Sequence, residues 1–278
     1  MPNHVETLLT VTGTEENIKK FVETCMIEKA KEDWNGGGLQ LDPETGNPII
    51  FTELDFNKII PMPESMHITS GTSTDNAVAL IKAENGDLSD ILSSRSFLGS
   101  DCPDGTDEVE FIIGKLKKRV SDEDLKQGQM ALDNIEKHGY KDWYSWSVAN
   151  WGTKWGAYDC VVVENGGDDK TFFLEYNTAW SPASPIISKL GEMFPELMFT
   201  NNYLDEGRNF FGTHTVCGEE GIDEDAAYEC EGDEFLNFAN NVFGYHLDKC
   251  AKCNAVYNPE WSEGDGTLCY DCENPEDA

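Results

Sequence analysis

Four cysteines near the end of the sequence form two CxxC pairs, Cys250 with Cys253 and Cys269 with Cys272, separated by fifteen residues. This spacing is typical of a structural zinc site, because each pair places two thiolates on one tight turn. All four ligands come from the protein, so the metal would have no open position for water or substrate. We therefore predict zinc as a structural cofactor, in a zinc ribbon over residues 245–278 that folds around the metal.

Two disulfides or four unpaired thiols are the alternatives to a metal. The sequence has nine cysteines, an odd number, and Cys25 and Cys160 fall within apolar patterns typical of a core. The first residues, Met1 to Glu6, carry no basic and apolar signal segment. Both observations favour a reducing compartment and hence zinc, and we expect the protein to be cytoplasmic.

A second group of ligand-type residues comprises His214, Cys217 and Cys230. Their spacing allows a second metal site, but a histidine at the end of a strand and two buried thiols are the favoured interpretation. A calcium loop starting at Asp223 is excluded, because its sixth position is Tyr228, where an EF-hand requires glycine.

The charge of the chain is extreme, with 53 acidic against 20 basic residues and a formal net charge of −33. Such a field repels nucleic acid and anionic membranes and attracts basic protein surfaces. We therefore expect no direct nucleic-acid partner, since that binding normally depends on Lys and Arg at phosphates. No run approaches the length of a membrane span. The basic run Lys115 to Arg119 lies between acidic residues and indicates a solvated helix face.

Acidic residues are densest over residues 218–234, which form either a solvated linker or an interaction surface. If they form a surface, their carboxylates can mimic the phosphates of DNA; general solubility is the simpler explanation of the same charge. The candidate partner-binding residues are Glu219, Glu220, Asp223, Glu224, Asp225, Glu229, Glu231, Asp233 and Glu234.

Residues 1–215 predict an α+β domain with a mostly antiparallel sheet covered by helices. Apolar residues alternate from Val5 to Val11, as in a strand, and Thr14 is placed to cap a following helix. Ile49 to Phe51 and Leu54 to Ile60 resemble strands. This β-α-β opening is typical of the first half of a ferredoxin-like split fold.

The rest of the chain divides into an insertion, a second half of the domain and a connector. We predict an inserted helical segment at 64–120, with a helix over Asn76 to Lys82, and an acidic connector at 216–244. After the insertion we predict a helix that follows the capping box Ser121 to Asp124. Two strands over Tyr158 to Val163 and Thr171 to Tyr176 are expected on either side of a turn at Asn165 to Asp169. A helix starting at Ser184 and Pro185 comes next, and the last predicted strands cover Leu197 to Phe199 and Phe210 to Thr215.

The segment Asn150 to Trp155 is the candidate ligand loop of the main domain. Lys154 lies between Trp151 and Trp155, an arrangement that can hold a phosphate or stack a base. Large aromatic residues more often belong to a core, so a packing role for both tryptophans is favoured.

Three motifs resemble the YubB-type ferredoxin-like family of plasmid and phage proteins, over roughly residues 4–215. They are Leu54 to Pro63, Asn150 to Trp155 with Ala157 to Asp159, and Thr178 to Pro182. The resemblance implies a split β-α-β fold and a mobile-element origin in a bacterial host, and it brings no established reaction. The chain departs from the pattern at Ala183, where a second proline is usual, and in its acidic segment and cysteine-rich tail.

Catalysis finds little support, because none of the five histidines falls in a nucleophile signature and there is no Walker-type or GxGxxG loop. We expect a non-enzymatic anti-defence protein that blocks a host restriction enzyme, CRISPR effector or Gabija-type nuclease through an acidic surface, with the zinc ribbon as a docking or homo-oligomer contact. The alternatives are an enzyme or nucleic-acid-processing factor centred on Lys154, and a zinc-stabilised adaptor whose acidity is only solvation.

Overall fold

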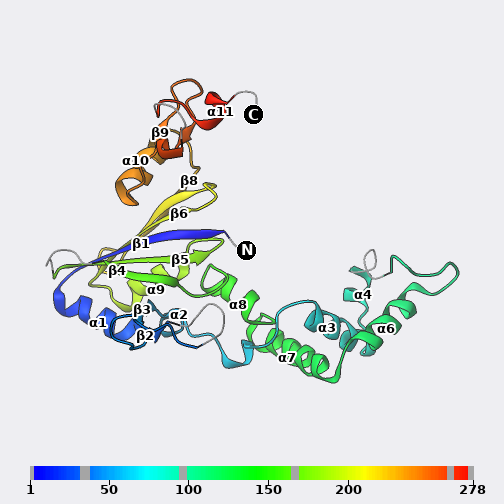
Figure 1. Cartoon of the computed structure of the whole chain (residues 1–278). Coiled ribbons are helices and arrows are strands. Elements are labelled where there is room, and N and C mark those ends of the chain that lie inside the picture. Colours follow the sequence, from blue (N-terminus) through cyan, green and yellow to red (C-terminus); the bar gives the residue numbers. More distant parts are fainter. Residues whose placement is uncertain (1–2, 32–37, 94–98, 164–168, 262–265, 275–278) are drawn as a thin grey trace. The chain divides into compact units, whose positions relative to one another are not determined.

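The computed structural model describes residues 3–31, 38–93, 99–163, 169–261 and 266–274 (Figure 1). The chain divides into two compact units, the first made of Met1–Ile60 with Trp151–Ala278 and the second of Pro61–Asn150. The predicted insertion at 64–120 is therefore too short, because two further helices belong to the second unit. The predicted turn at Asn165 to Asp169 falls outside the described residues except for its last residue.

The first unit is built on a six-stranded antiparallel sheet in the order β4-β5-β1-β6-β7-β8. The strands are β1 (His4–Thr12), β4 (Tyr158–Val163), β5 (Thr171–Ala179), β6 (Met198–Asp205), β7 (Phe211–Cys217) and β8 (Ile222–Tyr228).

Four of these strands and two helices form the ferredoxin-like domain. The helix α1 (Glu15–Cys25) follows β1, and α9 (Ser184–Met193) joins β5 to β6. Because β5 lies between β1 and β4 and is antiparallel to both, β1 and β4 run in the same direction with one strand between them. This is the split β-α-β arrangement, and β7 and β8 extend it beyond β6. The predicted α+β ferredoxin-like fold is confirmed.

The second strand of the split unit is not formed by residues 49–60, so that prediction is wrong. β3 (Ile50–Leu54) pairs with β2 (Met26–Ala30) in a separate two-stranded sheet. Beyond it the chain forms a helical turn, α2 (Phe56–Ile59), instead of a strand. Asp55 caps that turn by accepting a hydrogen bond from the backbone N–H of Asn57 at 3.0 Å. The apolar run after Asp55 therefore buries side chains at helical spacing.

Local signals are confirmed at the start of the chain. Thr14 accepts a hydrogen bond from the backbone N–H of Asn17, and α1 begins at the next residue. Phe21 on this helix is fully buried and makes edge contacts with Phe194 and Phe199, with ring centroids 5.8 and 5.6 Å apart. The helix thus covers the sheet face onto which the alternating residues of β1 point.

The helix α9 begins differently from the prediction. Ala183 stands at its N-cap position and makes no capping hydrogen bond, while Pro185 lies in the first turn. The hydroxyl of Ser184, predicted as the cap, donates instead to Asp225 on β8 at 2.6 Å. Ser184, which the sequence predicts as a helix cap, therefore connects α9 to β8 of the sheet.

The second unit is helical. It contains η1 (Glu64–Met66), α3 (Thr72–Glu84), α4 (Ser89–Ser93), α6 (Glu108–Arg119), α7 (Asp122–His138) and α8 (Trp143–Asn150). The capping box at Ser121 and Asp124 is confirmed at the start of α7. α3 packs against α7, and at this contact a Cβ added to Gly128 would lie only 2.7 Å from the Cβ of Ala77.

The segment 216–244, predicted as a connector, is folded. It contains β8, which pairs with β7 along its whole length, and α10 (Gly232–Val242). Phe235 and Ala239 of α10 pack with Leu204 and Phe211 of the sheet. Residues 199 and 204 of β6 point to opposite faces, so α10 covers the face opposite to α1 and α9.

The end of the chain forms short elements around the four cysteines. They are β9 (Asp248–Lys249), β10 (Val256–Tyr257), η2 (Pro259–Trp261) and α11 (Tyr270–Glu273). β9 and β10 pair with each other, and Leu247 joins the apolar cluster of α10. Within the part of the chain that the structure describes, every helix is too short or too polar to cross a lipid bilayer.

Candidate metal centre and acidic surface

The four cysteines of the two CxxC pairs lie together. The Sγ atoms of Cys250, Cys253, Cys269 and Cys272 are all within 4.8 Å of one another. Cys253 and Cys269 are 3.6 Å apart. Four thiolates around a tetrahedral ion with metal–sulfur bonds of about 2.3 Å would be about 3.8 Å apart. The group therefore fits a four-thiolate metal site, and it is the one such His, Cys, Asp or Glu cluster among the described residues.

Two backbone turns position these thiols. The backbone N–H of Asn254 donates to the carbonyl of Cys250 at 2.9 Å, and Asn254 itself has a positive φ of 64°. The other pair begins at the N-cap of α11, where the N–H of Cys272 donates to the carbonyl of Cys269 at 3.0 Å. A further bond, from Ala251 N–H to the Thr267 carbonyl, holds the two turns against each other.

Backbone N–H groups also prepare one thiol for ligation. Desolvation alone would raise the pKa of Cys250. Hydrogen bonds from the backbone of Cys269, Cys253 and Lys252 together lower it by more, so the resulting pKa is about 6. A thiol with this pKa is a thiolate at neutral pH, the form that binds a metal.

The predicted acidic residues divide into two classes. Three of them contact other side chains. Asp223 accepts from Ser188 at 3.2 Å, Asp225 accepts from the Tyr203 hydroxyl at 2.7 Å, and Asp233 forms an ion pair with Lys249 at 2.5 Å. Because Asp223 and Asp225 point toward α9, they help to attach β8 to the helix.

The other six carboxylates are exposed. No basic side chain of the described residues lies within 4 Å of any of them. They are Glu219, Glu220, Glu224, Glu229, Glu231 and Glu234. Two of them lie in the turn before β8, Glu224 lies on that edge strand, Glu229 follows it, and the last two lie at the start of α10.

The candidate ligand loop is divided between the two units. Asn150 ends α8, and its side chain donates to the Trp146 carbonyl at 2.9 Å. Trp151 is buried in the first unit, where its Nε1–H donates to the Ile60 carbonyl at 2.8 Å. The ammonium of Lys154 lies 4.6 Å from the centre of the Trp155 ring. These contacts correspond to the packing role favoured for the tryptophans.

The residues of the second candidate metal site are not brought together. Their strand spacing places His214 and Cys217 on opposite faces of β7. His214 is buried and its Nε2 lies 2.6 Å from Asp223 Oδ1, whereas Cys230 packs beside the apolar cluster of α10.

Sequence reasoning missed β8 and hence the contact between His214 and Asp223. A usable signal was the short turn between Gly218 and Gly221, of which Gly221 has a positive φ of 66°. Such a turn after a strand predicts a hairpin.

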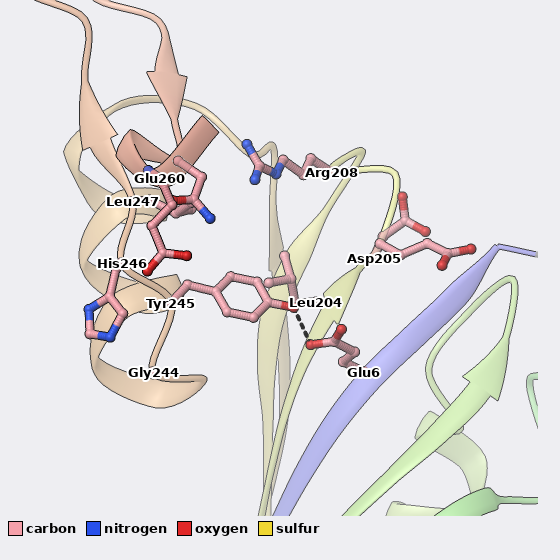
Figure 2. Close-up of a pocket in the computed structure, with 11 residues that line it drawn as sticks. Glu6, Leu204, Asp205, Arg208, Gly244, Tyr245, His246, Leu247 and Glu260 are labelled. Carbon is pink, nitrogen blue, oxygen red and sulfur yellow. Dashed lines mark hydrogen bonds between the residues drawn. The ribbon is translucent and has the colours of Figure 1, made fainter. Parts of the chain in front are cut away.

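A cavity of about 420 Å³ lies beside the turn between β6 and β7 (Figure 2). The hydroxyl of Tyr245 donates to the carboxylate of Glu6 at its wall. Figure 2 shows the side chain of Arg208 reaching from the turn toward the side formed by Leu247 and Glu260. Desolvation and the bond to Glu6 raise the pKa of Tyr245, so its hydroxyl stays protonated. The pair fastens the segment after α10 to β1 and resembles no catalytic arrangement.

One comparison with known proteins, a match to a family model, supports the fold. Residues 154–244 match a family model described as "Ferredoxin-like domain in Api92-like protein". The chain is also similar to the crystal structure of a protein api92 from Yersinia pseudotuberculosis, with 10% sequence identity and a TM-score of 0.37, over 84% of this chain and 100% of that one. No curated protein matches the chain. The YubB-type resemblance stays a prediction.

Proposed function

We propose that the protein works by binding, without catalysis, a basic nucleic-acid-handling surface of another protein. The observation that carries this proposal is the group of six exposed glutamates on β8, its preceding turn and the start of α10, in a chain of net charge −33. Carboxylates that have no basic neighbour among the described residues are available to meet cations of a partner. Their field would also accelerate encounter with such a partner.

The partner class we propose is a bacterial defence nuclease, of restriction, CRISPR or Gabija type. Support comes from the charge and from the sequence resemblance to plasmid and phage proteins, whose carriers meet such nucleases on entering a cell. The protein would then act in the cytoplasm of a bacterial host. An inhibitor of this kind occupies the groove that otherwise receives DNA phosphates.

Carboxylates also gather at the helix starts of the second unit. Asp107, Glu108 and Glu110 begin α6, and Asp122 and Glu123 begin α7. The acidity is therefore not confined to one patch, as a single mimicking surface would require. We propose the glutamates of the first unit as the contact because they lie on consecutive segments of the chain, from the turn before β8 to the start of α10.

The metal of the cysteine site is, we propose, zinc. Four thiolates at tetrahedral spacing suit zinc in a structural role. The pair of Asp233 with Lys249 joins α10 to this ribbon. A metal-bound ribbon would thus hold the start of α10, with Glu231 and Glu234, in a defined position.

The experiment measures inhibition of purified defence nucleases by the purified protein at 0.05 and 0.3 M salt. We expect inhibition that weakens at the higher salt, because screening reduces interactions between exposed charges. Replacing Glu224, Glu229 and Glu231 with Gln should reduce inhibition at least tenfold.

The matched control replaces Glu15, Glu16 and Glu28 with Gln, which removes the same charge from exposed positions elsewhere in the first unit. Equal effects of both triple variants would indicate general solubility and support the adaptor alternative. Absence of inhibition for every class of nuclease would reject the proposal. Loss of activity on Lys154→Ala alone would favour the nucleic-acid-processing alternative.

A further inference from the structure

The first unit has a hollow of about 500 Å³ between the end of β8 and one side of α10. Tyr228, the last residue of β8, lines it together with Phe211, its partner on β7. The centroids of the two rings are 5.5 Å apart and their planes are tilted by 32°, so Phe211 covers one side of the Tyr228 ring. Phe211 is buried, whereas Tyr228 is 51% exposed. Part of an aromatic ring is therefore available to a ligand at this place.

The helix α10 contributes residues at the spacing i, i+3, i+4 and i+7, which lie along one side of a helix. They are Glu234, Asn237, Phe238 and Asn241. The ring centroid of Phe238 is 4.8 Å from that of Phe211, so aromatic surface continues from the sheet to the helix. The other three residues of this set are exposed. The hollow thus combines aromatic surface with one carboxylate and two amides.

The charge of the hollow favours a positively charged ligand. Glu234 is the one charged residue among the described residues that line it. An anion would be repelled by this carboxylate, with no cationic lining residue to offset the repulsion. An apolar ligand would remove the carboxylate and the amides from water without giving them a hydrogen-bond partner, which costs free energy. A cation avoids both costs, and it is also attracted by the face of an aromatic ring.

Among cationic side chains, arginine fits these groups better than lysine. The guanidinium is planar and weakly hydrated, so it can stack on an aromatic ring and form two parallel hydrogen bonds with a carboxylate. It has five N–H donors, which leaves donors for the carbonyl oxygens of Asn237 and Asn241. The ammonium of lysine is compact and strongly hydrated, and it has no flat surface that could stack.

We propose that this hollow receives an arginine side chain of the partner protein, stacked on Tyr228 and paired with Glu234. The inference rests on the proposed function, since Glu234 is one of the six glutamates proposed as the contact, and it names the residue type that anchors the partner. Desolvated arginine and tyrosine side chains often dominate the energy of an interface, whereas exposed charges at its rim mainly change the association rate. The hollow would accordingly slow dissociation. Glutamates that do not line it, such as Glu219 and Glu220, would accelerate encounter.

The first test is an NMR titration of the isotope-labelled protein with acetyl-arginine methylamide at 0.15 M salt. The side-chain NH₂ signals of Asn237 and Asn241 report binding in the hollow, and we expect them to shift and to saturate. Two control compounds are the citrulline analogue, which keeps the planar group without the charge, and the lysine analogue, which keeps the charge without the planar group. Both should bind at least tenfold more weakly. Absence of saturable shifts with the arginine compound, or equal binding of either control, would overturn the proposal.

Variants extend the test to the complex with an inhibited nuclease. Tyr228→Leu and Glu234→Gln should each make dissociation of the complex at least tenfold faster. The matched controls are Tyr228→Phe, which keeps the ring, and Glu220→Gln, which removes the same charge outside the hollow. Both controls should leave the dissociation rate unchanged.

The outcomes separate this inference from the proposed function. Unchanged dissociation in either target variant, or equal acceleration in its control, would overturn the inference while the inhibition by the wild type leaves the proposed function standing. If no nuclease is inhibited, the proposed function fails, and the titration with the arginine compound decides whether the hollow binds a guanidinium group.

Discussion

The imidazole of His214 on β7 is buried, and its Nε2 lies 2.6 Å from Oδ1 of Asp223 on the edge strand β8. Ser188 of α9 donates to the same carboxylate oxygen. One exposed carboxylate thus joins a central strand, an edge strand and a covering helix. Since β8 also carries the exposed Glu224, this contact positions part of the proposed binding edge.

Removing the charge of this carboxylate should destabilise the first unit. We expect Asp223→Asn to lower the free energy of unfolding by about 1.5–2 kcal/mol, the lower part of the range for a hydrogen bond to a charged group, because the carboxylate is 54% exposed. Urea denaturation followed by tryptophan fluorescence measures the change. Glu224→Gln on the opposite face of the same strand is the control and should have little effect. Equal stability of both variants would contradict the role assigned to the pair.

The same pair predicts a dependence of stability on pH. Burial alone would raise the pKa of Asp223. Hydrogen bonds from His214 and Ser188 together have the larger and opposite effect, so the resulting pKa lies below the ordinary value of 3.8. A carboxylate with a depressed folded-state pKa stabilises the protein above the unfolded-state pKa and loses this contribution as pH falls through the folded-state value. The part of the stability difference between the wild type and Asp223→Asn that comes from this carboxylate should therefore be lost below about pH 4. A difference that grows on acidification would refute this assignment.

Metal removal should unfold the cysteine-rich end and leave the six-stranded sheet intact. We expect one zinc per chain by elemental analysis. A strong chelator should make four further thiols reactive toward a thiol reagent, because the metal supplies the folding free energy of such small sites. Cys272→Ser should reproduce the effect, with Cys102→Ser, outside the site, as control. Metal-free protein with unreactive cysteines would exclude the site.

The tryptophan loop should matter for stability more than for binding. We expect Trp151→Ala to cost about 3–5 kcal/mol, the range for removing a buried aromatic side chain. Lys154→Ala should cost less, about 1–2 kcal/mol, the value of a cation–π contact between half-buried groups. Thermal and urea unfolding test both values. Nuclease inhibition by Lys154→Ala should equal that of the wild type.

A pair of glycine substitutions tests the packing of the second unit. In Gly128→Ala the new Cβ would lie 2.7 Å from the Cβ of Ala77 and 3.1 Å from its carbonyl carbon, so α3 and α7 must separate. We expect a loss of about 1–3 kcal/mol. Gly114→Ala in α6 meets nothing within 4 Å and should stabilise the unit by up to about 1 kcal/mol through helix propensity. Opposite signs in thermal unfolding would confirm the helix contact.

Features that depend on near neighbours could be predicted from the sequence. Thr14 and Ser121 cap their helices because a hydroxyl reaches backbone N–H groups two or three residues away. The alternation in β1 identified a strand with one buried face. The two CxxC spacings identified the thiols that lie together. In each case the energy comes from groups close in sequence.

Features that depend on distant pairing were decided by the tertiary structure. Residues 49–60 contain apolar runs that suit a strand, yet β4 takes the place in the sheet because it forms a hairpin with β5. Composition made 216–244 look like a linker, whereas pairing with β7 made part of it a strand and engaged Asp223 and Asp225 inside the domain. Charge and apolarity can be counted along a chain. The exposure of a charged or apolar side chain depends instead on the residues, distant in sequence, that folding places next to it.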